Sequence, residues 1–230
     1  MIASHYNEMW QRFTDSARAN CLTLDPFIHS SLDTRRGITA LSYIDKNSQQ
    51  VADKISEFLT EVHKVEPEQY FYPRSDLHIT MLSIISCIED FTLSKVNIDE
   101  YIKAYNHVVA ECPPVEINFI GVTASESCIV IQGFPVDNNL HTFRKKLRQA
   151  FKSLPNTTFD SRYKLITAHC TAIRFCRPIK DSQRLFELCQ ANRERSFGSI
   201  VFNQFELVYN NWYQQRTHTE LLACAKLNNR

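Results

Sequence analysis

Two stretches of sequence decide how this chain folds: Leu77-His78-Ile79-Thr80-Met81-Leu82 and Leu165-Ile166-Thr167-Ala168-His169-Cys170-Thr171-Ala172-Ile173-Arg174-Phe175. Both interleave apolar and polar residues as β-strands do, and residues two apart in a strand share a face. Each stretch therefore places a histidine beside a threonine, His78 with Thr80 and His169 with Thr171. Two imidazoles and two hydroxyls are groups suited to acid–base chemistry on a phosphate.

The spacing of histidine and threonine is not specific by itself, because a histidine two residues before Thr or Ser occurs three times. The third case, His29 with Ser31, follows Pro26 without sustained alternation, which favours a loop. The other two cases have strand-like surroundings and lie 91 residues apart. That separation suits equivalent positions in two halves of one duplicated domain.

Length, composition and charge limit the classes of function. The chain has 230 residues, 43% of them hydrophobic, which is enough for one sizeable domain. Its formal net charge is +1, so no overall field attracts long DNA or RNA. We therefore expect a small nucleotide or a short RNA as the substrate, and no obligate protein partner is evident.

Several site types are excluded by what the sequence lacks. Its four glycines lie far apart, which excludes G-x-G-x-x-G and P-loop motifs, and no cofactor is indicated. The first twenty residues do not resemble a signal peptide, and no stretch resembles a membrane span. The eight cysteines are scattered without a C-x-x-C pair, which favours reduced thiols and a cytoplasmic location. A zinc site at His169, Cys170 and Cys176 is disfavoured because adjacent strand residues diverge.

Periodicity predicts alternating helices and strands in one α+β domain over residues 1–230, with residues 1–35 as an N-terminal helical extension. Helices are expected at residues 4–19, 48–65, 99–112, 140–154 and 182–195. Strands are expected at 38–44, 77–82, 115–123, 128–134 and 165–175, and the stretches 199–213 and 217–227 are expected to form an antiparallel hairpin.

The two motifs resemble the paired H-x-T signatures of the two-histidine (2H) phosphoesterase superfamily, in its 2′-5′ RNA ligase-like and cyclic phosphodiesterase branch. Arg174, five residues after His169, resembles the arginine of the H-x-T-x-x-R form in the ligase-like branch. The corresponding position of the first motif is Ser83. The similarity extends over the order of elements from about residue 36 to residue 227.

This resemblance implies a bilobal, pseudo-twofold α+β fold, with antiparallel sheets lining a central cleft and helices outside. It implies that His78 and His169 are the catalytic acid–base pair and that no metal is needed. Thr80 and Thr171 would bind the phosphate. Arg174 is a further phosphate-binding candidate, but alternation places it on the strand face opposite His169 unless a bulge turns it.

Aromatic and basic residues near the motifs allow two interpretations. Tyr72, Tyr209 and Trp212 are candidates for stacking on a nucleobase, although aromatic residues in strands more often belong to the core. The run from Arg144 to Arg148 is expected to be the exposed face of its helix. Cys170, which points away from His169, is expected in the core.

The leading hypothesis is a metal-independent phosphodiesterase acting on a 2′,3′-cyclic phosphate, a 2′-5′ linkage or a related RNA or nucleotide product. A non-catalytic nucleotide- or RNA-binding module with the same cleft is the alternative from another class. RNA ligation in the reverse direction is a third option, because one site serves both directions. The sequence does not decide which histidine is the base.

Overall fold

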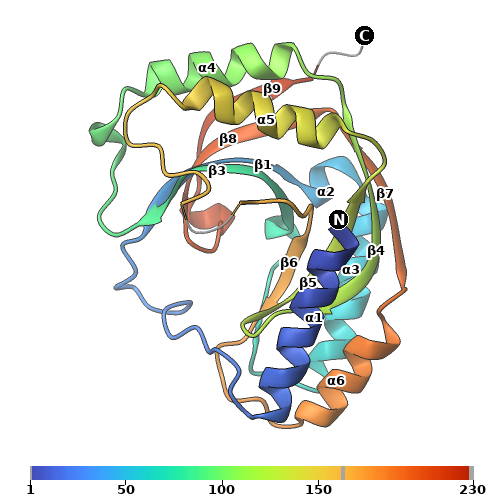
Figure 1. Cartoon of the computed structure of the whole chain (residues 1–230). Helices are drawn as coiled ribbons and strands as arrows, with labels where there is room; N and C mark the ends of the chain where they lie inside the picture. The colour runs from blue at the N-terminus through green and yellow to red at the C-terminus, as the bar shows by residue number, and fades with distance from the viewer. Residues whose placement is uncertain (1, 162–163, 228–230) are drawn as a thin grey trace.

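The chain forms two antiparallel sheets that face each other (Figure 1), and the computed structural model describes residues 2–161 and 164–227. The four-stranded sheet has the order β3 (His78–Ile88), β1 (Arg36–Tyr43), β8 (Gln204–Asn211), β9 (Glu220–Lys226). The five-stranded sheet has the order β2 (Tyr70–Phe71), β6 (Cys170–Arg174), β5 (Cys128–Pro135), β4 (Val115–Ala124), β7 (Ser196–Phe202). The predicted α+β class with antiparallel sheets is confirmed.

The longer helices lie on the outer faces of these sheets, as Figure 1 shows. They are α1 (Ile2–Arg18), α3 (Gln49–His63), α4 (Ile98–Ala110), α5 (Asn139–Phe151) and α6 (Ser182–Ala191), with the one-turn α2 (Ile44–Asn47) before α3. Helices α4 and α5 pack on the four-stranded sheet, α3 on β7, and α1 and α6 on β4. The predicted apolar face of α3 is buried, because Val51, Ile55, Phe58, Leu59 and Val62 recur at helical spacing.

The strand that bears His78 and the strand that follows His169 lie near sheet edges that meet. Strand β3 is the edge of the four-stranded sheet, and β6 is next to the short edge strand β2. Strands β3 and β6 are in contact. The two H-x-T motifs therefore come together where the inner faces of the sheets converge.

The predicted strand at residues 165–175 is only partly correct. Regular pairing begins at Cys170, so His169 lies one residue before β6. Residues 164–169 have no regular secondary structure. Strand β3, in contrast, continues six residues beyond the predicted end, to Ile88. His169 is therefore positioned by contacts other than a strand ladder, whereas Thr171 of the same motif is held in β6.

The predicted continuous stretch 199–213 is divided between the two sheets. Strand β7 pairs with β4, and β8 pairs with β1, so the chain crosses from one sheet to the other at Asn203. The alternation shifts phase at this crossing, because Ile200 and Phe202 are buried before it and Phe205 and Leu207 after it. The hairpin of β8 and β9 is confirmed, since the two strands pair antiparallel.

The N-terminal segment is helical only as far as Arg18, and residues 19–35 have no helix. Tyr6 is fully buried, and its hydroxyl donates to the Gly133 carbonyl and accepts from the Gly133 amide, both at 3.0 Å. Further along, the Asp25 amide donates to the Phe175 carbonyl at 2.8 Å. The segment is thus attached to the five-stranded sheet at Tyr6 and next to the end of β6 at Asp25.

Replacing Tyr6 by phenylalanine should lower the free energy of unfolding by about 1–3 kcal/mol, because two backbone groups of Gly133 lose a buried partner. Urea denaturation measures the change. Tyr105→Phe is the matched control, since the buried Tyr105 hydroxyl has no hydrogen-bond partner among the described residues. An equal effect of both substitutions would contradict this role for Tyr6.

Candidate functional site

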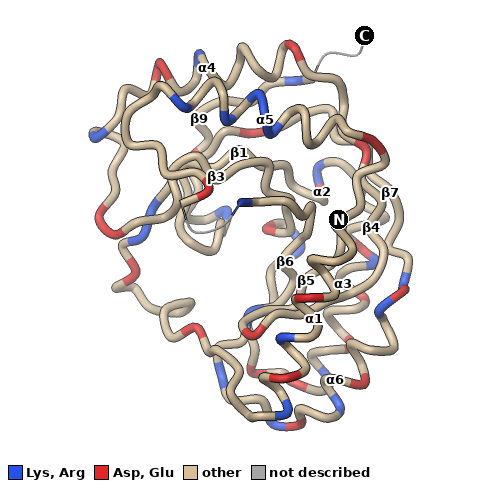
Figure 2. The backbone as a smooth tube through the Cα atoms, in the orientation of Figure 1, with Lys and Arg blue, Asp and Glu red and all other residues tan. Residues whose placement is uncertain are grey.

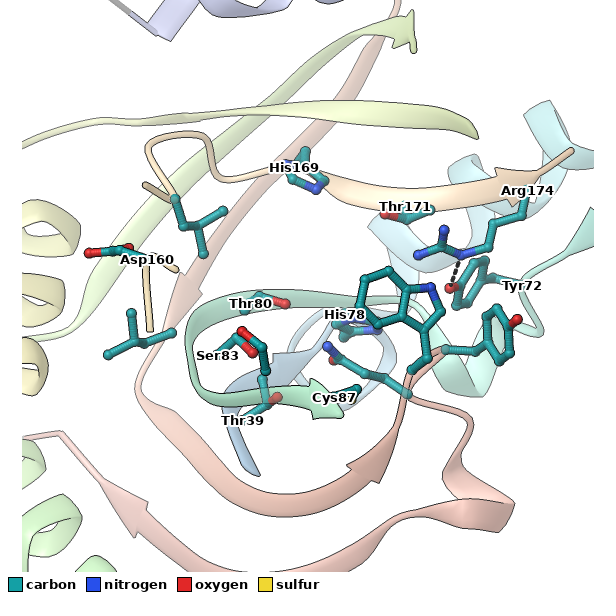
Figure 3. A pocket seen from close by; sticks show the side chains of 16 residues that line it. Thr39, Tyr72, His78, Thr80, Ser83, Cys87, Asp160, His169, Thr171 and Arg174 are labelled. Atoms are coloured by element: carbon teal, nitrogen blue, oxygen red, sulfur yellow. Dashed lines mark hydrogen bonds between the residues drawn. The ribbon is translucent and has the colours of Figure 1, made fainter. Parts of the chain in front are cut away.

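A pocket between the two sheets collects the motif residues that lie far apart in the sequence. His78 and Thr80 of β3 line it, together with His169, Thr171 and Arg174 at β6 (Figure 3). Its volume is about 170 Å³. Cavities of that size hold one benzene-sized molecule, so the pocket is suited to a small group and not to a folded polymer.

His78 is oriented by the backbone of a short 3₁₀ turn (Arg74–Asp76) that precedes β3. Its Nδ1 lies 2.6 Å from the carbonyl oxygen of Asp76, and the side chain is 7% exposed. Because a carbonyl oxygen only accepts, Nδ1 carries the hydrogen. Nε2 is then the nitrogen of His78 that is left for proton transfer.

His169 is oriented in a parallel way by the residue two positions before it. Its Nδ1 lies 2.7 Å from Oγ1 of Thr167. A hydroxyl both donates and accepts, so this contact does not by itself fix which nitrogen carries the hydrogen. Both imidazoles therefore use Nδ1 for orientation and keep Nε2 for chemistry, but only His78 is held by a backbone carbonyl.

The surroundings keep both histidines neutral at neutral pH. Burial lowers the pKa of His78, while its hydrogen bond to the Asp76 carbonyl and the Asp76 charge oppose this. Burial, followed by the charges of Arg144, His78 and Arg174, lowers the pKa of His169 to about 4. Because each of these influences on His169 disfavours its protonated form, His169 is the stronger candidate for a proton acceptor.

Arg174 reaches the pocket because β6 contains a bulge. In the pairing of β5 with β6, Val130 is opposite Thr171 and Ile129 is opposite Ile173, so Ala172 is the extra residue. The bulge interrupts the alternation that would turn Arg174 away. The guanidinium lines the pocket, and its Nε donates to the Tyr72 hydroxyl at 3.0 Å (Figure 3).

The three aromatic candidates have different positions. Trp212 lines the pocket, and the Arg35 guanidinium lies 4.9 Å from its ring centroid. Tyr72 also lines the pocket, but it is 2% exposed and its hydroxyl holds Arg174. The expectation for Tyr209 is corrected: it packs on Phe91 and donates its hydroxyl to the Phe91 carbonyl at 2.8 Å, away from the pocket lining.

The expectation that the Arg144 to Arg148 run is an exposed helix face is wrong for Arg144, which is 3% exposed. Helical spacing contains the signal: Leu140 and Leu147 lie one turn before and after it on the buried face of α5. Arg148 forms a two-point ion pair with Asp160, a pocket residue that the sequence did not suggest, at 2.6 and 2.9 Å. Lys145 is exposed as expected.

Other features of the sequence have plain structural outcomes. Cys170 is fully buried, as expected for a core residue, and burial raises its pKa to about 12. His29 lies in a loop, outside the pocket lining. Over residues 2–161 and 164–227, no three His, Cys, Asp or Glu side chains gather as a metal site would require. None of the described helices has the length and hydropathy of a membrane span.

Charge is mixed over the whole described chain. Figure 2 shows Lys and Arg interspersed with Asp and Glu on both lobes. A long nucleic acid is bound by a continuous basic surface, whereas here the cations that matter for the site, Arg144 and Arg174, are at or next to the pocket. The charge pattern favours a small anionic ligand.

Comparison with known proteins identifies the fold. No protein-family model matches the sequence, and no curated protein matches it. Among solved structures, TT0787 of Thermus thermophilus is 14% identical, with a TM-score of 0.58, and the match covers 83% of this chain and 97% of that one. Escherichia coli LigT complexed with 3′-AMP is 10% identical, with a TM-score of 0.56, and the match covers 84% and 98%.

A conserved protein of unknown function from Agrobacterium tumefaciens is 13% identical, with a TM-score of 0.58, and the match covers 91% of this chain and 98% of that one. A structure described as a phosphoesterase is 13% identical with a TM-score of 0.55. At these identities the likeness concerns the fold. The chain has the LigT-like α+β fold, which is the fold that the resemblance of its two motifs implied.

Acid should destabilise the protein between pH 6.5 and about pH 4, because unfolding lets His78 and His169 bind protons more readily. A folded pKa below the unfolded one gives stability that is complete above pH 6.5 and is lost as pH falls toward the folded value. The free energy of unfolding of the wild type should fall between pH 7 and pH 5. Replacing His169 by glutamine should make this fall smaller by about 1–2 kcal/mol.

Urea denaturation at the two pH values measures this difference. His141→Gln, at an exposed position of α5, is the control and should keep the pH dependence of the wild type. Equal losses in His169→Gln and the wild type would contradict a neutral His169 in the folded protein.

Proposed function

We propose that the chain, which has the LigT-like fold, is a metal-independent phosphodiesterase that uses His78 and His169 as an acid–base pair. The observation that carries the proposal is their matched orientation. The Nδ1 atom of each histidine contacts the residue two positions before it, Asp76 for His78 and Thr167 for His169. The Nε2 atoms of both histidines remain for proton transfer in one shared pocket. Histidine suits both roles because its protonation changes near neutral pH.

The two histidines have different roles in this proposal. His169, whose protonated form is disfavoured by burial and three neighbouring cationic or imidazole groups, takes a proton from the attacking water. His78, for which the Asp76 carbonyl and charge oppose the lowering of the pKa by burial, is better able than His169 to hold a proton, and it gives that proton to the leaving oxygen. The new P–O bond forms from the water oxygen as the bond to the sugar oxygen breaks, and solvent then restores the protonation states.

Thr80, Thr171 and Arg174 bind the phosphate in this proposal. The threonine hydroxyls donate hydrogen bonds to non-bridging oxygens, where negative charge increases in the transition state. Arg174 adds a fixed positive charge, since its Nε is already held by Tyr72 and its terminal nitrogens remain for the ligand. Trp212, which lines the same pocket as Arg174, is the residue proposed to stack on a base.

The proposed substrates are a 2′,3′-cyclic phosphate, a 2′-5′ phosphodiester or a related short RNA or nucleotide product. The pocket size and mixed surface charge support a small ligand. The E. coli LigT structure with this fold is complexed with 3′-AMP, a nucleotide with a phosphate on the ribose ring. The proposed location is the cytoplasm, where thiols stay reduced, because the cysteines are scattered in the sequence without a C-x-x-C pair.

Alanine at His78 or at His169 should lower kcat/KM for 2′,3′-cyclic AMP by about 10²–10⁴-fold, because each substitution removes one proton-transfer group. Chelator should leave the wild-type rate unchanged. Steady-state hydrolysis with detection of the monoester measures both effects. His29→Ala is the control, since this exposed histidine shares the H-x-S spacing but lies in a loop.

Full turnover by either alanine variant would overturn the catalytic assignment. Calorimetry with the same nucleotides separates the alternatives: tight binding without turnover by the wild type would indicate a binding module instead. Joining of RNA ends in preference to hydrolysis would indicate a ligase.

A further inference from the structure

One arginine that the proposed chemistry does not use joins the two motifs. Arg144 of α5 donates through Nε to the Met81 carbonyl at 2.8 Å and through Nη2 to the Thr80 carbonyl at 2.7 Å. It also donates through Nη1 to the Ile166 carbonyl at 3.0 Å and through Nη2 to the Thr167 carbonyl at 2.9 Å. One guanidinium therefore serves four carbonyls from two distant segments.

These carbonyls lie next to the proposed catalytic residues. Thr80 is the threonine of the first H-x-T motif, on β3. Thr167 is the residue whose hydroxyl oxygen lies 2.7 Å from Nδ1 of His169 and orients that ring. Residues 164–169 have no strand ladder to hold them. The same helix supports this segment once more, because Arg148 donates to the Leu165 carbonyl at 3.3 Å and pairs with Asp160. Helix α5 thus fixes the approach of the chain to His169.

The charge of Arg144 acts on the same histidine. Its four hydrogen-bond acceptors are neutral carbonyls, and the side chain is 3% exposed, so water screens the charge little. The charged or titratable groups that influence Arg144 are Arg148 of α5, Tyr6 of α1 and Asp160. Burial lowers the pKa of Arg144 to about 9, so it remains positive at neutral pH.

The charged or titratable groups that face His169 all disfavour its protonated form. They are Arg144 of α5, His78 of β3 and Arg174 of β6, and after burial Arg144 has the largest effect on the His169 pKa. Arg144 is therefore close enough to lower the proton affinity of His169, while its guanidinium donates hydrogen bonds to four backbone carbonyls.

We infer that Arg144 is a positioning residue of the proposed site, which holds the two histidine segments in register and brings its positive charge close to His169. This inference rests on the proposed function for its kinetic consequence. Its structural part does not, because the hydrogen bonds and the charge act whether or not the site turns over. Arg144 touches the backbone and not the substrate, so it acts through His169 and Thr80.

Lysine and methionine separate geometry from charge at this position. Lys retains a positive charge but offers a compact ammonium that does not reproduce the planar fork of donors. Met fills similar volume without charge or donors. Lys145→Met, on the exposed face of the same helix turn, is the matched control.

The experiment combines two readouts with a check of folding, all on the full chain. Histidine ring signals followed by NMR give the pKa of His169 in the wild type, Arg144→Lys, Arg144→Met and Lys145→Met, with assignment by His169→Gln. The pH profile of kcat/KM for 2′,3′-cyclic AMP gives the kinetic consequence, and circular dichroism gives the folded fraction.

The pKa of His169 should stay well below 6.5 in Arg144→Lys and rise by about one unit or more in Arg144→Met, which moves the acid limb of the pH profile upward. Arg144→Lys should lose at least about tenfold in kcat at the pH optimum, because misplacement of a catalytic group is costly. Lys145→Met should match the wild type in both readouts.

Wild-type kcat in folded Arg144→Lys, or an unchanged His169 pKa in Arg144→Met, would overturn the inference. If Arg144→Met does not fold, the lysine variant and the wild-type titration still decide, since a wild-type His169 pKa near 6.5 contradicts the electrostatic role. Absence of wild-type hydrolysis would instead overturn the proposed function, and the NMR readout would still test Arg144.

Discussion

The geometry of the pocket depends on one buried cation. The Arg144 guanidinium is held by four backbone carbonyls in place of water. Removal of a charge from water is costly, and only well-aligned hydrogen bonds offset that cost. The carbonyls must therefore stay where the guanidinium needs them, and the chain near Thr80 stays next to the chain near Thr167. Strand β3 of one sheet and the segment that leads into β6 of the other sheet are consequently held in one position relative to each other.

This constraint also determines the electrostatics of the site. Two imidazoles, Arg174 and Asp160 line the pocket, while Arg144 acts on His169 and Asp76 acts on His78 from beside it. Such an environment favours anionic ligands and neutral histidines. The two motifs nevertheless differ, since a backbone carbonyl orients His78 and a hydroxyl orients His169. A pseudo-symmetric pair of motifs can thus supply one proton donor and one proton acceptor.

Local irregularities, not the regular elements, turn the functional side chains into the pocket. The extra residue at Ala172 brings Arg174 to the same side as Thr171. The crossing at Asn203 sends β8 into the sheet that carries His78, and the turn after β8 brings Trp212 to the pocket. Each irregularity departs from the period of two on which strand prediction relies. The N-terminal segment adds contacts beside the pocket, where Tyr213 donates to Asp25 at 2.7 Å.

The α+β class, most helix and strand positions, and the pairing of His78 with Thr80 and His169 with Thr171 were predictable from the sequence, because they follow from local periodicity and spacing. The burial of Arg144, the position of Arg174 in the pocket lining and that of Tyr209 outside it became evident only in the folded chain. These outcomes depend on which carbonyls, bulges and rings from distant segments meet, and local sequence carries no record of such encounters. The burial of Arg144 is the exception, because its helical spacing from Leu140 and Leu147 places it on the buried face of α5. Its basic neighbours suggested an exposed face instead.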